Sequence, residues 1–446
     1  IDIITLNNQN VLIGTIEKEL KDKIALTTFD ETKTDIKLAD IKNINTLLLV
    51  DSSMLQEQLF SQEKKSDTKI ASIKENKLEF LKKLSYDSFL YFINEKNEKT
   101  GLIKDTSAEN SPASISACGF ALAAYCIAEK NGWASFEESY NMCLKLLQTF
   151  DQKLKNEHGF FYHFVDPETG ERAWNSEAST IDTAIFISGA LLAGEYFKKT
   201  EVEKLANKLY GQIDWNWMTN NTSLLSMGFK PESDFLPYYW NTFNEGILAY
   251  ILGIGSKTHP LPASSWTELK RLKSNTESLF VYQYPQIWVN FKNIKDNDYW
   301  QNAVDATYAN RQFCIDNKDK FKTYSETSWG LTASIGPEGY KAYGANPEHN
   351  IHDGTVAPSA VAGSVPFAPE ICIPTLQYMY QTYGSKLYGF YGFKDAYNID
   401  KNWFADKYVG INQGISVLMI ENYINGFVWN YFMELPAVKN WEKIVL

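Results

Sequence analysis

The pattern of hydrophobic and polar positions changes its period near residue 76. Before residue 51, short β-branched runs with partial alternation are separated by polar turns, which is the pattern of β-strands. These runs predict five strands, at Ile3–Leu6, Val11–Glu17, Lys23–Phe29, Lys33–Leu38 and Asn45–Val50. After residue 76 the apolar positions recur every three to four residues, which indicates α-helices.

Five strands within 50 residues predict a small β-barrel of the SH3-like or Sm-like kind over residues 1–50. The run TLNNQNVLIGTIE, followed by KIALTTF and DIKLADIKNI, resembles bacterial small-barrel modules of that kind. Residues 51–75 are rich in Ser, Gln and Lys and are typical of a linker. The first module contains no catalytic constellation, and whether it binds a cell-wall or protein partner stays open.

Two kinds of helix alternate over residues 76–446. One kind is long, charged and amphipathic and is expected to cover an exterior. Its members are Leu78–Glu95, Ser135–Lys155, Glu201–Gln212 and Trp300–Asn317. The other kind is apolar on nearly all sides and rich in small residues, so it must be buried on all sides. Its members are Pro112–Ala128, Ser179–Tyr196 and Asn241–Gly255.

Four further helical runs bring the count to about twelve helices. They are Trp329–Ser334, Val356–Ser364, Phe367–Gly384 and Ile411–Ile424. Six inner and six outer helices predict a mainly α fold, an (α/α)6 toroid, as one domain over residues 76–446. An irregular stack of helical hairpins is the alternative that the pattern leaves open.

Charge and composition exclude two classes of protein. The chain of 446 residues has a net charge of −11 and no basic block, so nucleic-acid binding is not expected. No apolar run reaches the 18 residues of a membrane span. Aromatic residues make up 14% of the chain, and only Phe29 and Phe60 precede residue 76. Such a density of Trp and Tyr in the helical domain favours a wide aromatic cleft.

Acidic residues stand at the starts of three predicted inner helices. Glu177 precedes the STIDT run with Asp182, Glu245 lies in WNTFNEG, and Glu326 lies in TYSETSWG. Two of these, Ser179-x-x-Asp182 and Thr242-x-x-Glu245, also fit a capping box, in which the carboxylate only satisfies a backbone N–H. Capping leaves the density of Trp, Tyr, Asn and Gly around these starts unexplained, whereas a substrate cleft needs that mixture.

Paired carboxylates in an aromatic, uncharged cleft are typical of glycosidic-bond chemistry. One carboxylic acid protonates the leaving oxygen, and a second group activates water or attacks directly. A carboxyl in a first helical turn is held ionised by the helix dipole. A general acid at Glu245 would therefore need desolvation, for example by Trp240 and Phe243, to raise its pKa.

Other chemistries find little support in the sequence. His158 and His163 have no metal-ligand spacing and are interpreted as ordinary core or surface histidines. The loop pair His349 and His352 is a weak candidate for a metal, and the five cysteines form neither a zinc motif nor a disulfide framework. No nucleophile elbow, phosphate loop or dinucleotide fingerprint occurs. No metal or other cofactor is therefore expected.

The region from about Lys83 onward resembles the bacterial glycoamylase-like glycoside hydrolases. That family includes endo-β-1,2-glucanases and the transglycosylating region of cyclic β-1,2-glucan synthases. The similar segments include GLIKDTSAENSPASISACGFALAAY, GFFYHFVDPETGERAW, SEASTIDTAIFISGALLAGEYF, YYWNTFNEGILAYILGIGSKTHPLP, LFVYQYPQIWVNF, SWGLTASIGPEGYKAYG, HDGTVAPSAVAGSVPFAPE and YVGINQGISVLMIENY. The resemblance implies an (α/α)6 barrel, metal-independent glycoside cleavage, and a periplasmic, cell-surface or secreted bacterial protein whose signal peptide has been removed.

The resemblance also implies roles for individual residues. Glu245 of FNEG corresponds to the general acid, and Glu326 before WGLTAS to a partner carboxylate, with Asp182 as the alternative base or proton relay. Side chains expected to line the sugar subsites are Glu177, Trp174, Trp288, Trp329, Tyr343 and Asp353. Two departures put the chemistry in question, because many relatives carry Asp at the positions of Asn412 and Ser334.

The sequence therefore predicts a glycoside hydrolase acting on a β-linked glucan or a related oligosaccharide, with the β-1,2-linked type favoured. Two alternatives remain. A polysaccharide lyase would use the same toroid, although the cations that a uronate demands are scarce here. A glycan-binding protein without catalysis would fit the two departures. The linkage, the endo or exo mode and the stereochemistry are left open.

Overall fold

The computed structural model describes the chain in two parts. In the first, it describes the backbone of residues 2–6, 11–19, 23–28, 33–37 and 41–46. In the second, it describes residues 77–446 apart from 273–274, 296–297 and 347–350. The chain divides into two compact units, Ile1–Asn76 and Lys77–Leu446, and each is described by itself.

The first unit contains a five-stranded antiparallel sheet with the strand order β4-β3-β2-β1-β5. Its strands are β1 (Asp2–Leu6), β2 (Val11–Glu19), β3 (Lys23–Thr28), β4 (Lys33–Lys37) and β5 (Ile41–Thr46). The fifth strand begins four residues before the predicted one. A closed barrel stays a prediction, and the predicted linker at 51–75 lies outside the described residues.

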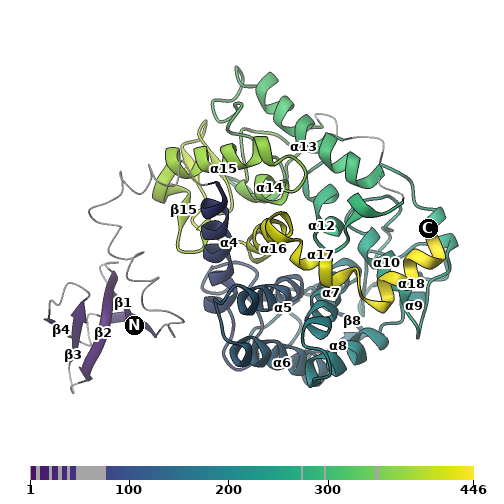
Figure 1. Ribbon diagram of the computed structural model, residues 1–446, viewed down its shortest axis with the longest axis horizontal. Coiled ribbons are helices and arrows are strands. Elements are labelled where there is room, and N and C mark those ends of the chain that lie inside the picture. Colours follow the sequence, from purple (N-terminus) through teal and green to yellow (C-terminus); the bar gives the residue numbers. More distant parts are fainter. Residues whose placement is uncertain are drawn as a thin grey trace. The chain divides into compact units, whose positions relative to one another are not determined.

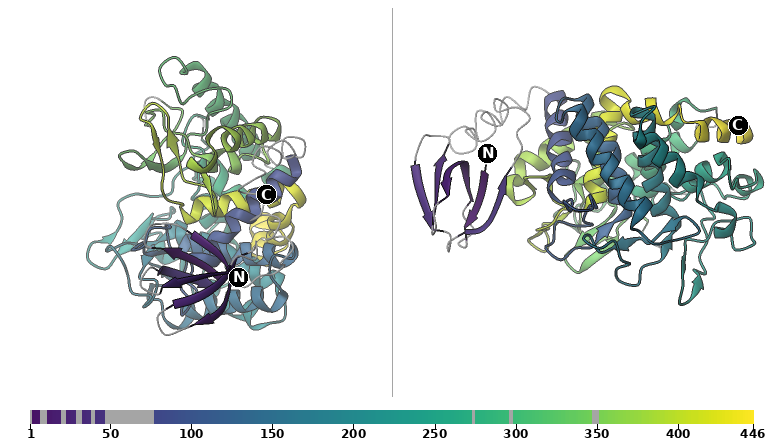
Figure 2. Two further views of the ribbon diagram at one scale, coloured as in Figure 1. Left: turned by 90° about the vertical axis from the view of Figure 1, so that its left-hand side faces the viewer. Right: turned by 90° about the horizontal axis from the view of Figure 1, so that it is seen from below.

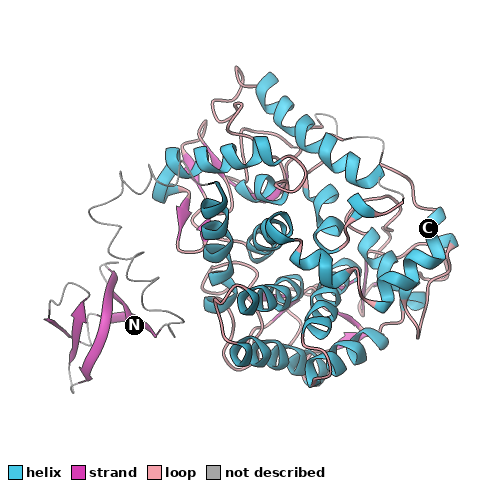
Figure 3. Ribbon diagram, viewed as in Figure 1, coloured by secondary structure: helices cyan, strands magenta, loops and turns pink. Residues whose placement is uncertain are grey.

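The second unit is mainly helical (Figures 1 and 3), and among its described residues six buried helices each have an outer partner. The inner helices are α5 (Ile115–Lys130), α7 (Thr180–Tyr196), α10 (Ile247–Gly255), α12 (Phe280–Trp288), α14 (Pro358–Gly363) and α16 (Gly410–Asn425). The outer helices, in the order of those partners, are α6 (Phe136–Gln152), α8 (Glu201–Gly211), α18 (Pro436–Val445), α13 (Asp298–Asp316), α15 (Pro369–Tyr383) and α4 (Lys77–Asn94).

The inner helices follow one another around the unit, and α16 returns to pack against α5. In Figure 1 the outer helices run along the rim of this unit with the inner helices inside, and Figure 2 gives two further views. The inner helices are largely buried, and in α5 every residue from Ile115 to Ala128 is buried. None of the described helices is both long and apolar enough to cross a membrane.

Short strands join the helices. They are β6 (Ala113–Ser114), β7 (Asn156–Glu157), β8 (Phe160–Phe161), β9 (Phe164–Val165), β10 (Ala178–Ser179), β11 (Gly228–Lys230), β12 (Asp234–Phe235), β13 (Ala333–Gly336), β14 (Gly339–Ala342), β15 (Tyr388–Gly389), β16 (Gly392–Phe393), β17 (Tyr397–Asn398) and β18 (Trp403–Phe404). They pair as small antiparallel ladders, for example β6 with β9 and β10 with β11.

Ten of these twelve helices agree with the sequence pattern, and two were missed. The inner helix α12 contains Pro285, a residue that sequence reasoning takes as a helix breaker, and α18 is a short helix near the end of the chain. The helix predicted at Trp329–Ser334 is wrong. Gly330 has φ +124°, and residues 333–342 form the β13–β14 hairpin around Pro337 and Glu338 instead.

Two glycines set the spacing of α5 and α7. A Cβ on Gly189 would lie 2.0 Å from the carbonyl oxygen of Gly119, and a Cβ on Gly119 would lie 2.5 Å from that of Ile185. Contacts this short force the backbones apart. The small residues that the sequence places in the buried helices therefore let these helices approach closely.

Gly189→Ala is expected to lower the free energy of unfolding by at least about 2 kcal/mol, because the new methyl group meets backbone that cannot move aside. Thermal unfolding followed by far-UV circular dichroism measures the effect. The matched control is Gly211→Ala, whose Cβ would make only an ordinary contact, 3.8 Å from the Thr258 methyl group. Equal melting temperatures for the two variants would refute the close approach.

Candidate active site

A cavity of about 550 Å³ lies at the N-terminal ends of the inner helices. The first turns of α5, α7, α12 and α16, the loop before α10, and the β13–β14 hairpin all contribute to its wall. The lining side chains include three carboxyls and one imidazole, and the rest are mostly apolar or aromatic: Asp105, Thr106, Ser116, His163, Phe164, Trp174, Ile181, Asp182, Ile185, Glu245, Phe280, Tyr284, Ala333, Ile335, Tyr340, Val409 and Ile411. Two of the predicted helix-start carboxylates, Asp182 and Glu245, thus face one cavity.

Asp182 is placed by the start of α7. Ser179 is the N-cap residue, and its Oγ accepts a hydrogen bond from the Asp182 N–H at 3.3 Å. The same hydroxyl donates to Asp182 Oδ2 at 2.6 Å, while the Ser116 hydroxyl from α5 donates to Oδ1. Asp182 therefore has a donor on each carboxylate oxygen, which holds its side chain in one orientation.

His163 is the cation of the cavity. Its Nδ1 lies 3.2 Å from Glu177 Oε1 and 3.4 Å from Asp182 Oδ2. Burial alone would lower the pKa of this imidazole, but the charge of Asp182 and the hydrogen bond and charge of Glu177 outweigh burial and raise it to about 9. His163 therefore carries a proton at neutral pH. The interpretation of His163 as an ordinary histidine was wrong, because its carboxylate partners lie 14 and 19 positions further along the chain.

Glu245 has a different environment. Its Oε2 is buried and has no hydrogen-bond partner among the described residues. Burial raises the pKa of this carboxyl to about 7, against a smaller lowering by its own backbone N–H. Trp240 and Phe243, whose side chains are nearly fully buried, precede it in the chain by five and two residues. A carboxyl that stays protonated up to about pH 7 can act as a proton donor.

The capping interpretation fails for Glu245 and holds only in part for Asp182. Helix α10 begins after Glu245, with Gly246 as its N-cap residue and no side-chain capping bond. At α7 the serine caps the helix, but the Asp182 carboxylate accepts from hydroxyl groups. Both carboxyls are thus available to a ligand in the cavity.

Two acidic residues that sequence reasoning missed lie in or beside the cavity. Asp105 lines it from the loop before α5, and burial raises the pKa of its carboxyl to about 6. Asp395 is buried, and its pKa is also raised to about 6 by burial. It accepts hydrogen bonds from Ile335 N and from Asn412 Nδ2, both at 2.6 Å. The amide at position 412 thus supports a neighbouring carboxyl, which no local motif indicated.

Several predicted subsite residues lie elsewhere. Trp174 does lie on the cavity wall, and its side chain is 68% exposed. Glu177 does not line the cavity but contacts His163 Nδ1 through its Oε1, at 3.2 Å. Trp288, Trp329 and Tyr343 are instead fully buried, so the prediction that they line subsites is corrected. Trp288 packs against Phe120 and Phe432, and Trp329 Nε1 donates to Thr375 at 2.9 Å. These aromatic residues belong to the core of the helix pairs.

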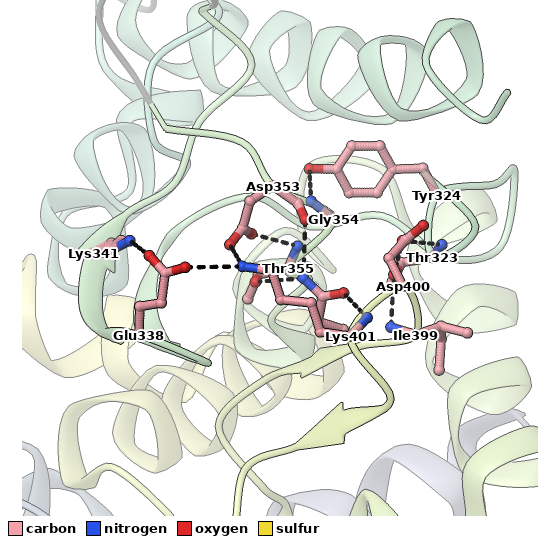
Figure 4. A network of polar contacts seen from close by, with 11 residues as sticks. Thr323, Tyr324, Glu338, Lys341, Asp353, Gly354, Thr355, Ile399, Asp400 and Lys401 are labelled. Carbon is pink, nitrogen blue, oxygen red and sulfur yellow. Dashed lines mark hydrogen bonds and ion pairs between the residues drawn. The ribbon is translucent and has the colours of Figure 1, made fainter. Parts of the chain in front are cut away.

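Glu326 and Asp353 also lie outside the cavity wall. Glu326 is exposed, and its backbone carbonyl accepts from Arg311 Nε at 3.0 Å, so the structure does not bring it together with Glu245. Asp353 belongs to the polar network drawn in Figure 4, where Lys401 Nζ lies 3.1 Å from its Oδ2 and 3.4 Å from Glu338 Oε1. The network also includes Asp400, which accepts from Thr323. None of these residues lines the cavity described above.

Among the described residues, one group offers three potential metal ligands. His163, Glu177 and Asp182 each place one ligand atom within 4.8 Å of the others. A metal needs an unprotonated imidazole nitrogen, whereas Nδ1 of His163 faces both carboxylates and the raised pKa keeps a proton on the ring. These residues therefore fit an ion-pair cluster better than a metal centre. The other candidate pair includes His349, which lies outside the described residues.

Comparison with known proteins finds relatives whose names describe enzymes acting on glucans. The Glycoamylase family model matches residues 237–436. The exo β-1,2-glucooligosaccharide sophorohydrolase (non-reducing end) of Parabacteroides distasonis is 27% identical over an alignment of 418 positions, and the alignment covers 80% of this chain and 56% of that protein. The chain thus spans little more than half the length of this curated relative.

Two solved structures share the fold. An endo-β-1,2-glucanase from Chitinophaga pinensis, in complex with sophorotriose and glucose, has a TM-score of 0.77 at 26% identity, over 83% of this chain and 98% of that one. A β-1,2-glucanase from Parabacteroides distasonis has a TM-score of 0.79 at 22% identity, over 95% of this chain and 64% of that one. The match over 237–436, the relative at 27% identity and the shared helical fold show that this chain is similar to glycoamylase-like proteins.

Proposed function

We propose that this protein is a glycoside hydrolase that cleaves β-1,2-linked glucan. The observation that carries the proposal is the Glu245 carboxyl, which burial keeps protonated up to about pH 7 on the wall of a cavity that also holds carboxylates. The names of the relatives support the linkage, because the curated relative is a β-1,2-glucooligosaccharide hydrolase and the Chitinophaga relative is an endo-β-1,2-glucanase.

In this proposal Glu245 donates its proton to the glycosidic oxygen as that bond breaks. Asp182 is the base or proton-relay carboxylate, because the hydroxyl groups of Ser116 and Ser179 orient it and the His163 imidazolium compensates its charge. The environments separate the two roles: burial favours the neutral acid of Glu245, whereas Asp182 is held by a hydroxyl donor on each carboxylate oxygen.

Two finer statements belong to the same proposal. The ring of six inner helices with six outer partners supports a closed (α/α)6 toroid, since each inner helix contacts its own outer helix and α16 contacts α5. A location in the bacterial periplasm or at the cell surface follows only from the family resemblance.

We expect the protein to release reducing sugars from β-1,2-glucan and to leave β-1,3- and β-1,4-glucans intact. Products are separated by chromatography after short incubations, so that a series of sizes indicates internal cleavage and a single disaccharide indicates cleavage from an end. The control is a glucan sample incubated with Glu245→Gln protein, in which the amount of sugar released should be at least about 10²-fold smaller.

Other results would contradict the proposal. A product with ultraviolet absorbance from an unsaturated uronide would indicate a lyase. Binding of β-1,2-glucan with no turnover at any pH between 4 and 8 would indicate a glycan-binding protein.

A further inference from the structure

Residues 172–177 form a tight segment that leads from β9 to β10 at the edge of the cavity. Trp174 and Asn175 have φ values of +55° and +49°, in the left-handed region that side chains other than glycine rarely adopt. Such a conformation costs of the order of 1 kcal/mol or more for a bulky residue and persists only where its surroundings hold it. The segment places the Trp174 side chain on the cavity wall and the Glu177 carboxylate within hydrogen-bond distance of His163.

Arg172 supplies two of the hydrogen bonds that hold this conformation, in addition to those between Ser176 and Phe164. Its Nε donates to the carbonyl oxygen of Ser176 at 2.5 Å, and its Nη2 donates to that of Asn175 at 2.9 Å. The two Nη atoms also donate to both carboxylate oxygens of Glu232, at 2.8 and 2.7 Å. Glu232 lies between β11 and β12, so one guanidinium joins the 172–177 segment to a separate hairpin.

The guanidinium is fixed from a third side. It lies over the ring of Tyr162, 4.8 Å from the ring centroid, and the Tyr162 hydroxyl donates to Glu157 at 2.6 Å. A planar fork that makes a bidentate pair, two bonds to backbone carbonyls and a ring contact is specific to arginine, because lysine has neither the plane nor the number of donors.

We infer that Arg172 is a positioning residue that holds the 172–177 segment in its left-handed conformation, so that Trp174 forms a fixed platform for a glycosyl unit at the mouth of the cavity. Trp174 is 68% exposed, and among the described residues its one ring contact is with Phe164, at 5.0 Å between centroids. Packing alone therefore holds this indole weakly, and the backbone must fix it. The glycosyl ligand named in this inference rests on the proposed function, whereas the role of Arg172 in holding the 172–177 segment does not.

The first test follows Trp174 without any substrate. The chain contains 12 tryptophans, and labelling with 5-fluorotryptophan makes each one visible by fluorine NMR. The Trp174 signal is identified by its absence in Trp174→Phe. In Arg172→Gln and Arg172→Lys we expect this signal to move or broaden while the other signals keep their positions. Glu232→Gln should have a smaller effect in the same direction, because the backbone bonds of Arg172 remain.

The second test is kinetic. With β-1,2-gluco-oligosaccharides, Arg172→Gln and Arg172→Lys should raise KM about tenfold and change kcat less than about threefold, because they loosen a stacking platform and spare the carboxyls. The matched control is Lys155→Gln, which removes a nearby exposed ion pair with Glu171 (3.0 Å) that does not involve Arg172. This variant should leave KM and the fluorine spectrum unchanged.

Two outcomes would overturn the inference. One is an unchanged Trp174 signal in Arg172→Gln together with an unchanged KM. The other is a loss of all tryptophan signals with a large drop in melting temperature, which would make Arg172 a residue of the general fold. If the wild-type protein does not act on β-1,2-glucan, the proposed function fails, and the fluorine spectrum still decides whether Arg172 holds Trp174.

Discussion

Glu245→Gln is expected to lower kcat by about 10²- to 10⁴-fold, the usual contribution of a general acid, while substrate still binds. Glutamine keeps the shape of the side chain and removes the proton that the leaving oxygen needs. In the wild type, activity should fall as the pH rises through about 7, because burial raises the pKa of Glu245 to that value and the ionised form cannot donate. The variant should lose this limb of the pH profile.

Stability provides an independent measurement of the same group. The folded pKa of about 7 lies above the ordinary value of 4.5, so stability is highest below pH 4.5 and is lost as the pH rises through 7. The loss amounts to about 3 kcal/mol at pH 8. Glu245→Gln removes this loss, so its melting temperature should decrease less between pH 4.5 and 8 than that of the wild type.

The matched control is Glu421→Gln. Glu421 is also buried, and burial raises its pKa, but it lies on the core side of α16, where Ser85 and Asn425 donate to it at 3.0 and 3.1 Å. This variant should keep wild-type kcat and the alkaline limb of the pH profile. Equal losses of kcat in the two variants would show that Glu245 acts only through the fold.

Asp182→Asn is expected to lower kcat by about 10²- to 10⁴-fold and also to change His163. The charge of Asp182 is the strongest of the influences that raise the pKa of His163 to about 9, so the variant should lower that pKa. Titration of the imidazole C–H signals by NMR measures this shift, with His163→Gln to identify the signal. Because the folded pKa of His163 lies above its usual 6.5, the stability from this ion pair is present below pH 6.5 and is lost as the pH rises through about 9.

Two further variants separate chemistry from structure at this position. Asp87→Asn changes a buried aspartate that contacts Lys83 and Tyr388 away from the cavity, and it should leave kcat unchanged below its melting temperature. Asp105→Asn changes the other aspartate on the cavity wall. If Asp105→Asn loses activity while Asp182→Asn retains it, the base is Asp105 and our assignment is wrong.

The sequence predicted most of the helical framework because burial leaves a strong mark on composition. Helices such as α5 and α7 are apolar on nearly all sides, and a helix of that kind must be buried on nearly all sides. The pattern failed where local signals conflict with packing. Helix α12 contains Pro285, and the run Trp329–Ser334 is apolar enough for a helix but contains Gly330 at φ +124°.

The candidate site was predictable only in part. Glu245 and Asp182 stood out because each precedes or begins a buried helix, and those helix ends converge on the cavity. His163, Asp105 and Asp395 carry no such signal, since each becomes notable only through partners distant in the chain. For the aromatic residues the reverse error occurred: Trp288 and Trp329 have the composition of a sugar platform but lie at 0% exposure in the core.

The sequence by itself determined the helical periodicity, the alternation of buried and covering helices, the family resemblance and the two carboxyls at helix starts, because each of these is a local property of the chain. Only the tertiary structure decided which titratable groups meet. It placed Glu245 in surroundings that keep its proton, surrounded Asp182 with hydroxyl donors and an imidazolium, and left Glu326 at the surface. The physical reason is that pKa values and side-chain exposure depend on distances between residues far apart in the chain, which no local pattern records.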